Sequence, residues 1–151
     1  MKVKLTLYCL IFLFACSSTK KAQSISINGL EVGVEYTLEQ IKKTLGNNPT
    51  EYSSWENESE NGYGYDLNYG SDNFNFGFMG FGYFSLSTNK FSVSGLFRVG
   101  DAVSVLSNIK NSRMELKEEG CYHFYLGHAD DPIVISFEDG VITSIWYMMS
   151  V

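Results

Sequence analysis

Three residues of types that bind metals or act as nucleophiles lie close together near the middle of the second half of the chain. Cys121 and His123 are two positions apart, so they point to the same side of a strand, and His128 follows shortly after. Three such ligands could hold zinc with an open coordination position. A cysteine beside a histidine could also serve as a nucleophile and its base. One hypothesis is therefore that the protein is an enzyme whose active site contains Cys121, His123 and His128.

We favour the interpretation that these residues have no catalytic or metal-binding role. Metal sites usually show tighter, repeated ligand spacings, and no third group is indicated that would orient His123 as a catalytic base. Carboxylates crowd the segment 47–61, but they lack the alternating Asp/Asn spacing with Gly of a calcium loop. The glycine run over 62–82 is not followed by a lysine at a helix start, as a phosphate cradle would be. We expect no enzymatic activity, no metal and no cofactor.

The N-terminus predicts export. Lys2 and Lys4 precede an apolar run over 5–15, which is shorter than the ~20 helical residues that span a membrane. The run ends in Leu13-Phe14-Ala15-Cys16, which resembles a bacterial lipobox, although Phe14 is bulkier than usual there. We predict a signal peptide over 1–15, then a lipidated Cys16 and a short polar tether over 16–24. An ordinary secretory signal is the alternative.

The negative charge of the chain argues against one class of partner. The formal net charge is −6, and loss of Lys2 and Lys4 with the leader makes it −8. An acidic chain without a basic cluster argues against nucleic acid as a partner. We therefore expect the protein to be anchored to a membrane through its lipid alone, with its domain facing the periplasm or the cell surface.

A repeated order of elements organises the rest of the chain, which is predicted to be one domain over 25–151. Segments 27–33 and 93–100 are similar, and each precedes a helical pattern, the first capped by Thr37 and the second by Asp101. Alternating strands follow in both halves. The predicted strands are 65–69, 74–78 and 83–88 in the first half and 122–126, 133–137 and 141–149 in the second. We expect an α+β fold of two tandem α-β-β-β units, 25–92 and 93–151, with an antiparallel sheet and both helices on one face.

Period-2 alternation predicts which side chains meet the helices. The predicted core face holds Tyr65, Leu67, Tyr69, Phe74, Phe76, Phe78, Tyr122, Phe124, Leu126, Ile133, Ile135, Phe137, Val141, Thr143, Ile145 and Tyr147. The last strand would then point Ile142, Ser144, Trp146 and Met148 outward.

A few residues of the first helix carry a family resemblance. Leu38-Glu39-Gln40-Ile41, followed by Leu45-Gly46 and Pro49, together with the lipoprotein signal and tandem layout, resembles the superfamily of the β-lactamase inhibitor protein. The small lipoprotein of the outer-membrane barrel assembly machine belongs to the same superfamily. The spacing departs from the pattern, because two Asn separate Gly46 from Pro49. The resemblance implies a non-enzymatic domain that binds proteins with the sheet face opposite its helices, and it transfers no interface residue.

The aromatic excess of the chain gives an independent clue to a binding face. Aromatic residues make up 15% of the sequence, and some of them fall outside the predicted core. A joined exposed patch of Trp, Tyr and other apolar residues usually marks an interface. The predicted binding residues are Trp146, Tyr125, Met148, Phe84, Leu86 and His123. We expect a lipoprotein whose sheet face binds another protein, as an inhibitor or assembly factor, with a small-molecule or glycan binder as the alternative.

Overall fold

The computed structural model describes residues 24–57 and 62–150. The elements are β1 (Ser26–Ile27), β2 (Leu30–Glu31), α1 (Leu38–Leu45), β3 (Glu51–Asn57), β4 (Gly62–Tyr69), β5 (Asp72–Gly77), β6 (Gly80–Leu86), the 3₁₀ helix η1 (Val103–Asn108), β7 (Ser112–Glu118), β8 (Cys121–Leu126), β9 (Ile133–Glu138) and β10 (Val141–Met148). The signal peptide, Cys16 and nearly all of the tether predicted above fall outside the described residues.

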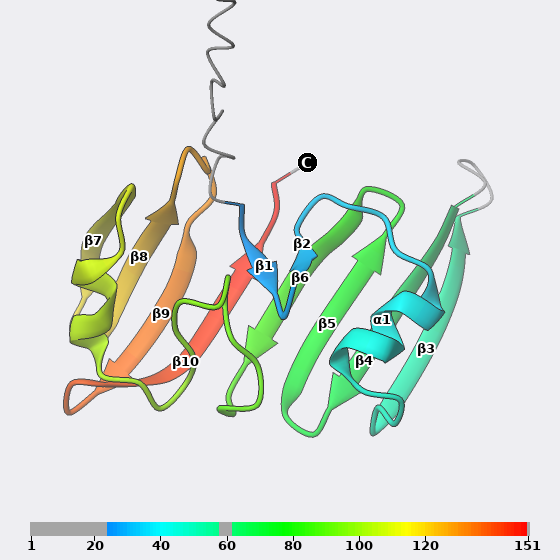
Figure 1. Ribbon diagram of the computed structural model, residues 1–151, viewed down its shortest axis with the longest axis horizontal. Helices are drawn as coiled ribbons and strands as arrows, with labels where there is room; N and C mark the ends of the chain where they lie inside the picture. Colours follow the sequence, from blue (N-terminus) through cyan, green and yellow to red (C-terminus); the bar gives the residue numbers. More distant parts are fainter. Residues whose placement is uncertain (1–23, 58–61, 151) are drawn as a thin grey trace, which may run out of the picture.

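Eight of the strands form one antiparallel sheet (Figure 1). Their order across the sheet is β3-β4-β5-β6-β10-β9-β8-β7, so each half of the sheet is a four-strand meander. The two meanders join through their last strands, where Trp146 of β10 lies opposite Ser85 of β6. The first strand of each meander therefore lies at an edge of the sheet.

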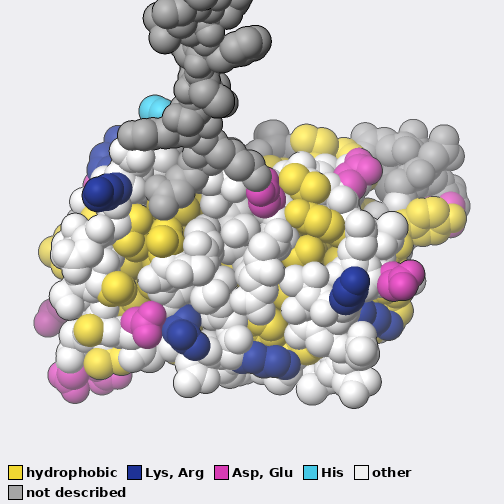
Figure 2. Space-filling view, in the orientation of Figure 1, with side chains coloured by type: hydrophobic (Ala, Val, Ile, Leu, Met, Phe, Trp, Pro, Cys, Tyr) yellow, Lys and Arg dark blue, Asp and Glu magenta, His cyan; other side chains and the backbone are white. Residues whose placement is uncertain are grey.

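The short elements all cover the same side of this sheet. In Figure 1, α1, the β1–β2 hairpin, the connection 87–102 and η1 lie in front of the strands. The hairpin is bonded to the connection, since the N–H of Ser94 donates to the carbonyl of Ser26 at 2.7 Å. Figure 2, in the same orientation, shows hydrophobic side chains in the gaps between these covering elements. The sheet thus has one covered side, and its other side carries none of the described elements.

Helix α1 begins where the sequence predicts. The side chain of Thr37 accepts a hydrogen bond from the Gln40 N–H at 3.3 Å, and the Gln40 side chain accepts one from the Thr37 N–H at 2.8 Å. This reciprocal capping box satisfies two of the N–H groups that a helix start leaves without partners. Gly46 ends the helix at φ 125°, a conformation that favours glycine. The predicted Thr37 cap is confirmed.

The predicted fold class is wrong. The described chain is mostly antiparallel β with one short α-helix, and it is not an α+β tandem repeat with two helices. The second predicted helix is the 3₁₀ helix η1, and its N-cap residue, Ala102, provides no side-chain cap. Val103, Leu106 and Ile109 recur every three residues, which is the period of a 3₁₀ helix rather than the 3.6 of an α-helix. Asp101 instead accepts a hydrogen bond from the Arg98 N–H at 2.9 Å.

Each half of the sheet also has a strand that the sequence interpretation missed. Strand β3 occupies part of the carboxylate-rich segment 47–61, where no strand is predicted, and pairs with β4 along its whole length. Strand β7 alternates charged residues with Met114 and Leu116 and pairs with β8. Both are edge strands, in which polar and charged side chains are frequent. The alternation in β7 is visible in the sequence, whereas β3 shows no apolar alternation of this kind.

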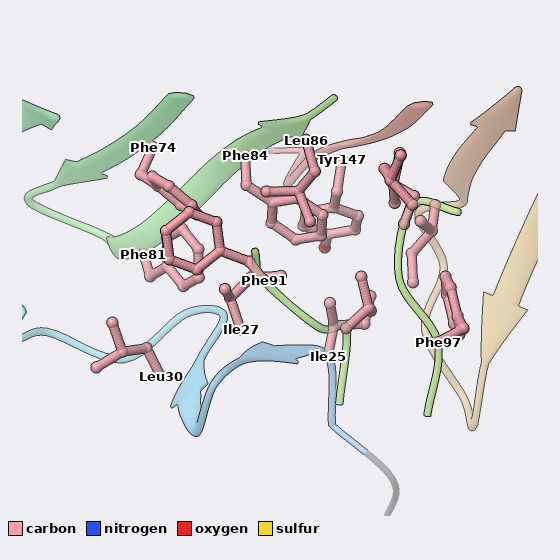
Figure 3. Close-up of a cluster of buried hydrophobic side chains, with 14 of the residues drawn as sticks. Ile25, Ile27, Leu30, Phe74, Phe81, Phe84, Leu86, Phe91, Phe97 and Tyr147 are labelled. Atoms are coloured by element: carbon pink, nitrogen blue, oxygen red, sulfur yellow. The ribbon is translucent and has the colours of Figure 1, made fainter. Parts of the chain in front are cut away.

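The core lies between the sheet and the covering elements. Figure 3 shows Phe74, Phe81, Phe84 and Leu86 of the sheet directed toward Ile27 of the hairpin and toward the connection. The buried hydrophobic side chains of the described residues are Ile25, Ile27, Leu30, Ile41, Leu45, Leu67, Tyr69, Phe74, Phe76, Phe81, Phe84, Leu86, Phe91, Val93, Phe97, Val99, Leu106, Phe124, Leu126, Ile133, Ile135, Ile142, Ile145 and Tyr147.

The predicted orientation is wrong for one residue after β5 and for three residues of β10. Phe78 is exposed because β5 ends at Gly77 and places Phe78 in the turn to β6. Val141 and Thr143 are exposed and Ile142 is buried, the reverse of the prediction. A β-bulge between Ile142 and Ser144 adds one residue to β10 and moves the side chains before it to the other side of the sheet. After the bulge the predicted alternation holds.

Tyr147 makes the fold sensitive to alkaline pH. Burial, followed by the negative charge of Asp131, raises the pKa of Tyr147 from 10.0 to about 12. The unfolded chain therefore loses this proton near pH 10 while the folded chain keeps it, so the stabilisation present below pH 10 is lost as the pH rises toward 12. We expect Tyr147→Phe to flatten the loss of stability in this range and to remove a late-titrating tyrosine. Tyrosinate absorbance and denaturant unfolding at each pH measure the two effects, and an unchanged titration in Tyr147→Phe would contradict this assignment.

Candidate functional site: the uncovered face of the sheet

The side of the sheet opposite the covering elements displays a band of large side chains near its centre. Trp146 of β10 and Tyr83 of β6 pack edge to face with ring centroids 6.4 Å apart. Met148 lies opposite Tyr83, and Val134 of β9 lies opposite Trp146. Trp146 is 38% exposed and Met148 is 53% exposed. The middle of this face therefore carries an accessible apolar cluster, with polar side chains such as Ser85 beside it.

The end of this face formed by β7 and β8 carries charge. The guanidinium of Arg113 lies over the Tyr125 ring, 4.1 Å from its centroid. Glu115, opposite His123 in the sheet, forms ion pairs with Lys117 at 2.7 Å and with Arg113 at 3.3 Å. The hydrogen bond from Lys117 is the main cause that lowers the pKa of Glu115, with the nearby positive charges as further causes. These groups can offer both signs of charge to a partner.

The opposite end of the face, on β3 to β5, is polar. Asp66 accepts hydrogen bonds from Asn75 at 2.6 Å and from Ser53 at 3.3 Å, which ties three neighbouring strands together. The ring of Trp55 lies across Gly64, where an added Cβ would meet ring atoms at 2.0 Å. Glycine is therefore needed at position 64 for this tryptophan to lie flat on the sheet.

The structure places four of the six predicted binding residues on the uncovered face. Trp146, Met148, Tyr125 and His123 share it, because β10 and β8 alternate in the predicted phase. The prediction is wrong for the remaining two, Phe84 and Leu86, which are fully buried in the core.

The error lies in the phase of β6. Ser85 and Tyr83 pair with Trp146 and Met148, so these two residues of β6 face outward. Tyr83 is the binding-face residue that the sequence interpretation missed. The signal was present, because Tyr83 and Ser85 form the more polar of the two alternating sets in this strand, and that set faces solvent when one side of a sheet is buried.

The cysteine and histidines do not come together as a catalytic or metal-binding set. Cys121 and His123 both lie on the uncovered face, whereas His128 is exposed beyond the end of β8. Among the described residues, no group of three or more His, Cys, Asp and Glu is arranged to hold a metal ion. Burial, with the charge of Glu118, raises the pKa of the Cys121 thiol, which reduces its thiolate fraction at neutral pH.

Comparisons with known proteins leave the family of this chain open. No family model, no curated protein and no solved structure matches it. Membership of the β-lactamase inhibitor protein superfamily therefore stays a prediction from the helix motif. Across the described part of the chain, no helix is long and apolar enough to cross a membrane.

Proposed function

We propose that this chain is an exported, lipid-anchored module that binds another protein through the uncovered face of its sheet. The observation that carries the proposal is the group of Trp146, Tyr83 and Met148 at the centre of that face, where no described element covers them. Exposed Trp and Tyr surrounded by polar side chains are frequent binding anchors. The export and the anchor rest on the N-terminal sequence alone.

The dimensions of the face suit a protein partner. Eight strands about 4.8 Å apart span roughly 34 Å, and strands of this length extend about 20–27 Å. The resulting area is on the order of 800 Å², which is what each partner contributes to a typical stable interface. Its chemistry also fits, because the apolar centre is flanked by Arg113 and Glu115 at one end and by Asp66 and Asn75 at the other.

Folding does not account for the position of Trp146. The other alternating set of β10, represented by Ile145 and Tyr147, faces the core and is buried. Trp146 contacts Tyr83 edge to face but remains more than a third exposed. A polar side chain at this position would serve the fold equally well.

A glycan binder using the same face is the second candidate, and one observation favours it. Trp55 lies flat across Gly64, and Asp66 and Asn75 are on the neighbouring strands of the same face. A flat aromatic ring with carboxylate and amide groups beside it can stack on and hydrogen-bond a sugar ring. This candidate predicts loss of binding in Trp55→Ala, whereas the protein-binding proposal centres on Trp146.

Site-specific photocrosslinking tests the proposal. A photoreactive residue in place of Ser136 on the uncovered face should crosslink one protein in the native membrane, and one in place of Ser107 on η1 should not. With the captured partner purified, Trp146→Ala should weaken binding by about 2 kcal/mol or more, roughly 30-fold. Its stability should barely change, because an exposed side chain contributes little to the core.

Tyr52→Ala provides the matched control, because Tyr52 is an exposed aromatic residue on the covered side of β3. Its affinity for the partner should stay within about twofold of wild type. Equal losses in Trp146→Ala and Tyr52→Ala, or crosslinks from position 107 alone, would count against the uncovered face as the interface.

A further inference from the structure

The turn between β5 and β6 has unusual residues at its tip. Phe78 and Met79 form the tip and are 39% and 47% exposed. Gly77 and Gly80 flank them, and Gly80, at φ 87°, provides the left-handed conformation that the turn requires. The turn geometry therefore places no demand for large apolar side chains at positions 78 and 79.

The described hairpin turns at the opposite end of the large sheet are polar. Their tips are Gly70-Ser71 between β4 and β5, Glu119-Gly120 between β7 and β8, and Asp139-Gly140 between β9 and β10. These are ordinary turn residues, which keep the tips hydrated. Among the described two-residue tips of this sheet, the β5–β6 turn alone combines two large apolar residues.

The chain enters the domain at the end that carries this apolar tip. The N–H of Val32 donates to the carbonyl of Ile25 at 2.9 Å, which places the start of β1 beside the segment after β2. The segment after β2 in turn lies beside the start of β6, because the N–H of Phe81 donates to the carbonyl of Val34 at 2.9 Å. Val34 is itself 39% exposed. In Figure 1, the start of β1 and the β5–β6 turn both lie along the upper edge, and hydrophobic side chains are visible there in Figure 2.

We propose that this tip, formed by Phe78, Met79 and Val34, rests in the interfacial region of the membrane to which the domain is anchored. The inference rests on the proposed lipidation of Cys16. The eight residues that follow Cys16, from Ser17 to Ser24, reach at most about 28 Å when fully extended, so the lipid holds this end of the domain close to the bilayer. Large apolar side chains at a membrane-facing end gain from leaving water, and Tyr63, 60% exposed, lies at the same end of the sheet.

Acidic residues at this end of the sheet indicate which lipids the tip can contact. Glu35 follows Val34 directly and is exposed, and the loop after β8 carries Asp130. These carboxylates oppose attraction to anionic headgroups, so the contact depends on apolar burial. We therefore expect the tip to engage zwitterionic phosphatidylcholine vesicles, with no strengthening when anionic lipid is added.

The oxidation rate of Met79 can report whether the tip is buried in the membrane. The full chain, matured in a bacterial host, is bound to phosphatidylcholine vesicles, separated by flotation and treated with a charged, membrane-impermeant oxidant. Met79 and Met114 have similar exposed fractions, 47% and 39%, but Met114 lies on β7, away from the tip. Mass spectrometry should show Met79 oxidised about fivefold more slowly on vesicles than in the unanchored Cys16→Ser variant. The rate for Met114 should be unchanged.

Two variants sharpen the test. Phe78→Ser should restore rapid oxidation of Met79 on vesicles, whereas Leu116→Ser, a change at an exposed apolar residue of β7, should leave Met79 protected. Flotation with equal oxidation of Met79 and Met114 would overturn the inference and leave the anchor intact. Failure of the wild type to float would refute the anchor and the inference together. Protection of Met79 that appears only when a partner protein is added would assign the tip to that protein instead.

Discussion

Phe76→Ala should lower the free energy of unfolding by about 3–5 kcal/mol, a large share of the stability of a domain this size. The Phe76 side chain is 2% exposed and stacks on Phe81 with ring centroids 4.5 Å apart. Tyr36 packs against its edge at 6.5 Å, which joins the sheet to the segment before α1. Truncation removes the buried ring and leaves a cavity that these neighbours cannot fill. Urea unfolding at neutral pH measures the loss.

Phe78→Ala is the control for this change. Phe78 is two residues further along the chain but lies in the turn, 39% exposed. Its truncation should cost less than about 1 kcal/mol, since little buried surface is lost. The sequence pattern predicts that both phenylalanines face the core. A similar loss in the free energy of unfolding for both variants would therefore contradict the exposed position of Phe78 in the turn.

Asp72→Ala should cost about 3 kcal/mol or more, because it leaves three partly buried donors without an acceptor. Asp72 is fully buried at the start of β5. Its Oδ1 accepts hydrogen bonds from the N–H groups of Ser87 at 2.7 Å and Thr88 at 3.0 Å, and its Oδ2 accepts one from the Thr88 hydroxyl. These bonds fix the chain where it leaves β6 and turns toward the covered side.

Asp72→Asn separates the hydrogen bonding from the packing at this site. The amide oxygen can still accept from the two backbone N–H groups, so the expected loss is about 1 kcal/mol. Thermal unfolding of both variants at neutral pH gives the comparison. An Asn variant as unstable as the Ala variant would mean that the carboxylate acts through its charge, and a stable Ala variant would mean that residues 87–88 are not held by Asp72.

The binding face was partly predictable because it depends on local alternation. The period of β10 near its end, where no bulge intervenes, predicts that Trp146 and Met148 face outward. The same reasoning failed one strand away at Phe84 and Leu86. Both alternating sets of β6 contain an aromatic residue, so the more polar Tyr83 and Ser85 set is only a weak signal of which side faces solvent, and the pairing with β10 decides it.

The missed strand β3 shows the same dependence on a neighbouring strand. Strand β3 is rich in Ser and Glu, and it forms because β4 offers it a continuous row of partners from Asn68 to Gly62. An edge strand of this composition has no hydrophobic signature of its own. The covering segment 103–108 was predicted as an α-helix although its apolar residues recur every three positions, which is the 3₁₀ period.

Elements whose causes are local can be predicted from the residues that form them. The capping box of Thr37 and Gln40 starts α1, and the Asp139-Gly140 turn joins two alternating strands, because these interactions span a few residues. The side of β6 and of the first residues of β10 that faces the core depends on contacts between distant segments. A bulge between Ile142 and Ser144 inverts the side chains before it, and the β6–β10 pairing sets Tyr83 beside Met148. A shift of one residue reverses every side chain of a strand, and hydrogen bonds between distant segments choose that shift.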